Sequence, residues 1–471
     1  MRGNPEGIIS IKSKQEILDV IKIAFKNQIN LIPALSRDDF YGTTLTTEGG
    51  FILDLTGLKK VEVVRDRYRG MSTDIEPGIT FNELNEKLEE EKLRALLPLR
   101  MPGDISVLDA YYGKHALLES NKPGYSQDWR LITYQIAIQD GYFIGTGSAG
   151  LETRGNPSAF PFSPRADLGR MFLGASGSFG IIGRGTCKLK HTVDHYEFLI
   201  AKGDDINYMI TNARDIAKKT EAAQAILVAD DKCLAAFLSN SIENYDHIRA
   251  RLDRWNTLII IGGEEELVQV EKEDILDEAR KNSFLLSEIS PGTKLHNTIK
   301  QQSQKQTNIR TFFDRKPHLK FDFYTTANRI PIIKKVVSRY LQEKNLDEDE
   351  YVGFLANSLE LGRTYFCEYD FFHQEQEPNP DELPLIGNVT IAELYHDVAT
   401  LVLDEGGVIN VPRNPVISDI IYKRKELANY FTILRKLKYC MDPTNIMHPT
   451  ILFNGKGGLV CDNIVMEESI K

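Results

Sequence analysis

The amino-acid sequence predicts an α+β protein, because three stretches with different predicted secondary structure follow one another along the chain. Residues 1–192 contain short β-rich runs and few helices. Residues 193–424 alternate strands with longer helical stretches, so we expect a separate α+β domain there, an antiparallel sheet flanked by helices. Residues 425–471 begin with apolar residues at helical spacing, which predicts a long amphipathic helix. A chain of 471 residues is long enough for two or three such domains.

Individual elements are predicted from capping and turn signals. Ser13 and Glu16 form an S-x-x-E capping box ahead of a helix, and Thr80 and Glu83 form a second one. Asp140-Gly141 lies between two alternating apolar runs and predicts a β-hairpin.

Composition and charge narrow the class of protein. Hydrophobic residues make up 42% and charged residues 26% of the chain, which is typical of a globular protein. The net charge of −10 argues against nonspecific nucleic-acid binding. We find no signal-peptide pattern and no apolar run long enough for a membrane span, so we expect a cytoplasmic protein. The five cysteines lack zinc or iron–sulfur spacing, and no metal site is predicted.

The most informative segment is a glycine loop at residues 174–181, which reads G-A-S-G-S-F-G-I. Glycine allows a cofactor to approach the backbone closely, and the serines can donate hydrogen bonds. A dinucleotide fingerprint of the Rossmann type runs from strand through loop to helix. Here a helical stretch precedes the loop and a strand-like stretch follows it, so the order is reversed.

This loop, with the residues before it, resembles the phrase D-L-x-x-L-F-x-G-S-E-G-x-L-G-I-I of the vanillyl-alcohol oxidase and p-cresol methylhydroxylase flavoprotein family. Ala175, Ser176 and Phe179 depart from that phrase. Further phrases similar to those of the family occur in the family's order; they lie at residues 49–55, 74–80, 102–103, 140–141 and 441–449.

The resemblance implies a two-part FAD-binding domain of the p-cresol methylhydroxylase (PCMH) type. It would comprise residues 1–192 and the returning segment 425–471, with residues 193–424 as a substrate-capping domain. FAD would be bound non-covalently between the two halves of the FAD-binding domain. The implied cofactor-binding residues are Pro33, Ser36, Arg37, Gly42, Pro102, Gly103, Asp167, Gly174, Ser176, Gly177, Ser178, Gly180, Ile181 and His448.

The resemblance also implies catalytic residues and a reaction. Tyr125 and Asp128 lie in a segment similar to the Y-G-D-H-W of the phenol-oxidising branch, and either can take a proton. Arg413 falls near the family's Tyr-Arg pair and would stabilise an anion. We therefore expect a flavin oxidase or dehydrogenase that removes a hydride from a small alcohol, hydroxy acid or phenolic substrate.

One departure from the family's sequence, in its phosphate-binding loops, leaves other functions open. The family's glycine-rich pyrophosphate loop is replaced here by A-L-S-R-D-D-F-Y-G at residues 34–42, and the glycine pair of the second loop, near Asp109, is also missing. A carboxylate facing a pyrophosphate weakens binding. An FAD-deficient subunit that acts as a structural or docking partner in a larger redox complex is therefore one alternative, and a transferase that uses FAD without net redox is another.

The expected partners follow from the same resemblance. We expect a small-molecule substrate and no nucleic acid. The electron acceptor is open, with dioxygen and a separate iron–sulfur or electron-transfer subunit as candidates. We also expect a homo- or hetero-oligomer.

Overall fold

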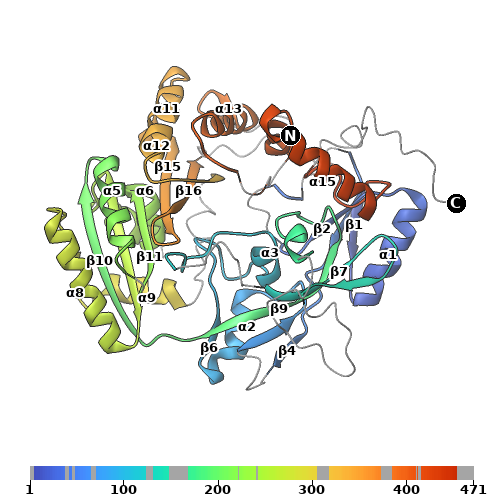
Figure 1. The fold of residues 1–471 in the computed structure, drawn as a ribbon, viewed down its shortest axis with the longest axis horizontal. Coiled ribbons are helices and arrows are strands. Elements are labelled where there is room, and N and C mark those ends of the chain that lie inside the picture. The colour runs from blue at the N-terminus through green and yellow to red at the C-terminus, as the bar shows by residue number, and fades with distance from the viewer. Residues whose placement is uncertain are drawn as a thin grey trace.

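The computed structural model describes residues 5–37, 42–44, 48–64, 71–122, 131–147, 168–220, 222–239, 242–304, 318–372, 385–409, 411 and 415–452. Its two large sheets lie side by side, the seven-stranded sheet to the left and the six-stranded sheet to the right in Figure 1. Strand β9 of the six-stranded sheet leads through only three residues into β10 of the seven-stranded sheet.

The six-stranded sheet is antiparallel, in the order β4-β5-β9-β7-β8 with β6 also paired to β9. Its strands are β4 (Val61–Val64), β5 (Ser72–Ile75), β6 (Leu93–Ala95), β7 (Leu131–Ala137), β8 (Phe143–Gly145) and β9 (Ile181–His191). Beside it lies a parallel three-stranded sheet in the order β1-β3-β2. Those strands are β1 (Gly7–Ser10), β2 (Leu31–Ala34) and β3 (Phe51–Asp54). The helices of this region are α1 (Lys14–Asn27), α2 (Phe81–Leu88), α3 (Val107–Tyr112) and α4 (Gly169–Phe172).

The seven-stranded sheet is antiparallel, in the order β13-β10-β12-β11-β15-β16-β14. Its strands are β10 (His195–Gly203), β11 (Ala223–Asp230), β12 (Trp255–Gly263), β13 (Ser287–Glu288), β14 (His318–Thr325), β15 (Val352–Leu359) and β16 (Thr364–Phe372). The central strands β11 and β15 are buried along their whole length, which indicates that both faces of the sheet are covered.

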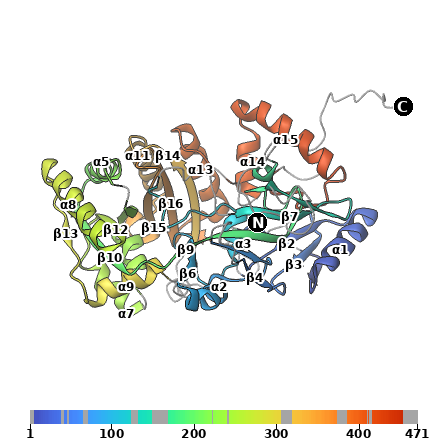
Figure 2. The same cartoon turned by 60° about the horizontal axis from the view of Figure 1, so that its bottom comes forward.

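Helices cover both faces of this sheet (Figure 2). One face packs with α5 (Ile206–Ala217), α8 (Glu265–Lys281), α11 (Ile330–Glu343) and α13 (Ile391–Asp404). The other face packs with α6 (Asp231–Leu238) and α9 (Lys294–Gln304), and α7 (Ile242–Arg249) rests on α6. Leu99, Ala116 and Leu118 join the same apolar cluster, so the first region of the chain contacts this second face directly.

The end of the chain returns to the first region. Helices α14 (Pro415–Tyr422) and α15 (Ala428–Met441) lead to a segment that lies parallel to β2. The Leu31 N–H donates to the Ile446 carbonyl at 2.8 Å, and the His448 N–H donates to the Leu31 carbonyl at 2.9 Å. The remaining elements are α12 (Glu348–Tyr351), β17 (Leu385–Ile386), β18 (Val389–Thr390) and the 3-10 turns Glu89–Glu91 and Lys425–Leu427.

The structure confirms the predicted α+β fold and the local signals. Ser13 caps α1, and Thr80 and Glu83 form both bonds of a capping box on α2. The hairpin at Asp140-Gly141 joins β7 and β8, with Gly141 at φ 73°. Cys187, Cys233 and Cys367 are buried, whereas Cys440 is exposed on α15. Within the described ranges, no helix combines the length and apolar character needed to cross a membrane.

Candidate functional site

The glycine loop lies between α4 and β9, in the predicted order of helix, loop and strand. Gly174 and Gly177 have φ of 78° and 85°, a left-handed region that favours glycine. A Cβ at Gly177 would come within 2.3 Å of the Pro33 side chain. The glycines therefore allow the loop to pack closely against the end of β2.

A buried lysine ties the C-terminal segment to this loop. Lys438 Nζ donates to Asp442 Oδ2 and to the Met447 carbonyl, both at 2.7 Å, and to the Ser178 carbonyl at 2.5 Å. Burial lowers the pKa of Lys438, and the Asp442 carboxylate partly offsets that shift. These bonds hold His448 against the loop, where its Nδ1 lies 2.5 Å from the Ser176 carbonyl and its carbonyl accepts from Ser178 Oγ at 3.2 Å.

The two loops predicted to hold phosphates also meet. Ser36 Oγ donates to Asp109 Oδ2 at 2.6 Å and accepts from the Ser106 N–H at 3.0 Å. Ser106 Oγ in turn accepts from the Asp109 N–H at 3.1 Å and thereby caps α3. The structure therefore brings the segment after β2 and the segment before α3 to one place, beside the glycine loop.

The predicted cofactor residues fall into three groups. Most lie in these loops, next to them in the chain or bonded to them; they are Pro33, Ser36, Pro102, Gly103, Gly174, Ser176, Gly177, Ser178, Gly180, Ile181 and His448. Arg37 is exposed and Gly42 is half-buried at the borders of the described segments. Asp167 lies outside the described residues, as do the three predicted catalytic residues Tyr125, Asp128 and Arg413.

The arrangement of the three loops fits the FAD that the resemblance implies. The backbone of the glycine loop, left-handed at Gly174 and Gly177, is the kind of group that a dinucleotide can approach closely. The Ser36 hydroxyl donates its one proton to Asp109, so it offers no donor to a phosphate in this arrangement. The Asp109 carboxylate opposes a phosphate, because two like charges about 4 Å apart repel by roughly 4 kcal/mol at an effective dielectric of 20. The chain therefore keeps the shape of the cofactor site and carries one unfavourable charge in it.

A second feature is a buried charge cluster where residues 94–122 meet the seven-stranded sheet, a contact we call the sheet seam. Arg100 Nη1 donates to Glu368 Oε1 at 2.8 Å, and its Nη2 donates to Asp370 Oδ2 at 2.6 Å. Lys320 Nζ donates to Glu368 Oε1 and to the Arg100 carbonyl, both at 3.2 Å. We call Arg100, Lys320, Glu368 and Asp370 the Arg100 cluster.

The Arg100 cluster is almost free of solvent, since none of its side chains is more than 2% exposed. Burial opposes the charge of Arg100, but Asp370, Cys233 and Glu368 together outweigh burial and raise its pKa. Burial raises the pKa of Glu368, and Lys320 only partly offsets that shift. The Cys233 thiol of α6 also donates to Asp370 Oδ2, at 3.2 Å.

A third feature lies further along the sheet seam. Arg94 forms an ion pair with Glu119, and Lys190 Nζ reaches Glu119 Oε2 at 2.7 Å. Lys122 Nζ lies 3.7 Å from the same oxygen. We call Arg94, Glu119, Lys122 and Lys190 the Arg94 cluster. Burial raises the pKa of Glu119, but the three cations, Arg94 first, bring it well below its usual range.

The sequence did not single out either cluster as a functional site. One signal was present, because Glu368 and Asp370 share a face of a strand that is otherwise apolar or aromatic, and a buried strand does not carry charges without partners. The partners themselves are far away in the chain, and no local pattern points to Arg94 or Arg100.

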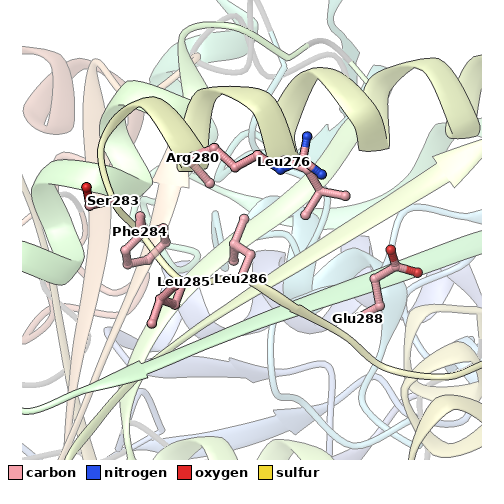
Figure 3. A pocket seen from close by; sticks show the side chains of 8 residues that line it. Leu276, Arg280, Ser283, Phe284, Leu285, Leu286 and Glu288 are labelled. Carbon is pink, nitrogen blue, oxygen red and sulfur yellow. The ribbon is translucent and has the colours of Figure 1, made fainter.

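A surface hollow of about 860 Å3 lies at the edge of the seven-stranded sheet, between the end of α8 and β13 (Figure 3). Its lining is mostly apolar and includes Leu285, which is 86% exposed. Among the described residues that line it, Arg280 and Glu288 are charged. None of the predicted site residues lines it, so it is separate from the loops described above.

Comparison with known proteins agrees with this architecture. Residues 5–105 match a family model described as an FAD binding domain. The chain is 25% identical over 191 residues to the mitochondrial D-lactate dehydrogenase (cytochrome) of Arabidopsis thaliana, covering 41% of this chain and 31% of the relative. It is 21% identical over 213 residues to the glycolate oxidase subunit GlcD of Bacillus subtilis, covering 45% and 43%. It thus spans less than half the length of each relative.

Solved structures match over nearly the whole chain. The 4-ethylphenol oxidase of Gulosibacter chungangensis superposes with a TM-score of 0.76 at 16% identity, covering 95% of this chain and 89% of that one. p-Cresol methylhydroxylase superposes with a TM-score of 0.73 at 15% identity, covering 94% and 88%. Alkyldihydroxyacetonephosphate synthase gives 0.63 at 16% identity, covering 94% and 75%. The chain therefore has the fold of the PCMH-type FAD-linked oxidase family and, over residues 5–105, its FAD binding domain, with FAD as the cofactor.

Proposed function

We propose that this protein is an FAD-dependent oxidase or dehydrogenase acting on a small alcohol, hydroxy acid or phenolic substrate. The observation that carries the proposal is the convergence of the segment at Ser36, the segment at Ser106 and the glycine loop at Gly177. The names of the relatives, a D-lactate dehydrogenase, a glycolate oxidase subunit and a 4-ethylphenol oxidase, support the same substrate range.

Bound FAD would supply a two-electron acceptor for a hydride from a substrate C–H bond. In this proposal the chain holds the cofactor through the glycine loop, whose backbone is left-handed at Gly174 and Gly177. In this proposal Arg413 binds or stabilises a substrate anion, and Tyr125 or Asp128 takes the substrate proton. Dioxygen or a separate electron-transfer subunit accepts the electrons, and we propose a homo- or hetero-oligomer.

The visible spectrum of the freshly purified protein tests the cofactor. We expect a flavin band at about one FAD per chain that bleaches anaerobically with one of D-lactate, glycolate or a 4-alkylphenol. A folded protein that stays colourless after FAD is added would instead support the FAD-deficient subunit. A flavin band with no reduction by any such substrate would favour the transferase alternative.

A pair of glycine variants tests the glycine loop. Gly177→Ala places a Cβ against Pro33 at 2.3 Å, so we expect the flavin content per folded chain to fall at least severalfold. Gly292→Ala is the matched control, because Gly292 also has a positive φ of 77° but has no atom within 4 Å of the added Cβ. Equal flavin content in the two variants would contradict a role of the loop in FAD binding.

A further inference from the structure

The Arg94 cluster contains a buried guanidinium that its surroundings do not satisfy. The Arg94 side chain is 2% exposed and pairs with one carboxylate, that of Glu119. Its Nε and Nη1 have no hydrogen-bond partner among the described residues. A buried donor without an acceptor costs roughly 1–3 kcal/mol, and more when it is charged.

The charges of this cluster do not balance either. Among the described residues, Arg94, Lys122 and Lys190 share one carboxylate, that of Glu119, which leaves a formal excess of two positive charges there. Burying uncompensated charge is costly unless a counter-charge is present. Burial and the neighbouring Lys190 lower the pKa of Lys122 to about 8, as expected for cations that crowd one another.

A neighbouring polar atom adds a further donor. The Tyr196 hydroxyl on β10 is buried and lacks a partner in the described part of the chain, and burial, partly offset by Arg94, raises its pKa to about 12. The Arg94 guanidinium and the Tyr196 hydroxyl interact electrostatically and lack acceptors among the described residues, and both are donors of the kind that bind an oxyanion.

We propose that the Arg94 cluster is a binding site for a small oxyanion, a carboxylate or a phosphate group. Arg94 on β6 would bind the anion at the bottom of the site. Lys122 and Lys190, whose side chains are 39% and 30% exposed, would line the entrance from solvent. An anion there would join β6 and β9 to β10 across the sheet seam. This site is separate from the cofactor loops and does not depend on the proposed redox function.

Calorimetry and thermal unfolding of the purified full-length protein test the proposal, with malonate and inorganic phosphate as separate probes. We expect wild type to bind at least one of them, with a raised Tm and an affinity that falls as salt is added. Binding of malonate alone assigns the site to carboxylates, and binding of phosphate alone assigns it to phosphates. Lys190→Met should weaken binding about tenfold, which corresponds to about 1.4 kcal/mol.

Lys188→Met is the matched control, because Lys188 is an exposed lysine on the same strand β9 and is not part of the cluster. It removes the same charge and should change the affinity less than twofold. Arg94→Lys keeps the charge but loses the unbonded nitrogens, and it should weaken binding as much as Lys190→Met. The proposal is overturned if wild type binds neither probe, or if Lys188→Met and Lys190→Met lose equal affinity.

Discussion

The Arg100 and Arg94 clusters lie on the same sheet seam and contain the same kinds of residue, yet they differ in charge balance. In the Arg100 cluster two cations face two carboxylates, and both terminal nitrogens of the guanidinium donate to them. In the Arg94 cluster three cations face one carboxylate, and among the described residues both Nε and Nη1 of Arg94 lack acceptors, whereas in Arg100 Nε lacks one.

This difference in charge balance suggests different roles for the two clusters, one in stability and one in ligand binding. A balanced and bonded cluster holds two parts of a protein in one geometry, and breaking it is expensive because the partner charge stays buried. A cluster with excess charge and donors without acceptors is costly to bury, and a bound anion would relieve that cost. We therefore expect mutation of the first cluster to affect stability, and mutation of the second to affect ligand binding and the response to pH.

Arg100→Met should have the largest effect on stability. It leaves Glu368 and Asp370 buried with Lys320 as their remaining cation, and removing one partner of a buried pair costs about 3–5 kcal/mol. Urea unfolding would show this as a lower midpoint. Arg339→Met, at an exposed arginine on α11, should leave the midpoint nearly unchanged. A loss below about 1 kcal/mol for Arg100→Met would mean that the cluster does not hold the seam together.

Glu119→Gln should have an intermediate effect and distinguish the two clusters. The change removes the carboxylate of the Arg94 cluster and raises its excess charge from two to three, so we expect a lower Tm. Added phosphate or malonate should then raise the Tm more in Glu119→Gln than in wild type, because the anion replaces the missing charge. The same anions should give Arg100→Met no larger shift than wild type. If they stabilise both variants equally, the difference between the clusters is not one of charge balance.

The pH dependence should be the smallest effect. The pKa of Lys122 is about 8 in the folded protein and 10.5 when unperturbed, so the unfolded chain binds more protons between these values. The unfavourable interaction of charged Lys122 is fully present below about pH 8 and is relieved as the pH rises toward 10.5. Because solvent screens the charge of this partly exposed lysine, the stability gained at high pH is small.

We therefore expect the Tm of wild type to rise relative to that of Lys122→Met as the pH is raised from 7 to 9.5. This range brackets the Lys122 pKa of about 8. Lys188→Met should follow wild type over this range. A constant difference between wild type and Lys122→Met would show that Lys122 does not titrate in the Arg94 cluster.

Much of the fold could be predicted because its signals are local. The capping residues Ser13 and Thr80 and the turn at Asp140-Gly141 act over three or four residues, and each produced the expected element. The order of helix, glycine loop and strand also followed from neighbouring residues and led to the correct fold. The predicted catalytic residues Tyr125, Asp128 and Arg413 lie outside the described residues, so their roles stay predictions.

The sequence by itself thus determined the α+β class, the helix starts, the hairpin and the position of the glycine loop. Only the tertiary structure decided which charges meet. Arg100 reaches Asp370 across 270 positions, and Ser36 reaches Asp109 across 73. Such pairs depend on how the two sheets pack against residues 94–122, and packing of that kind leaves no periodic pattern in the residues it joins.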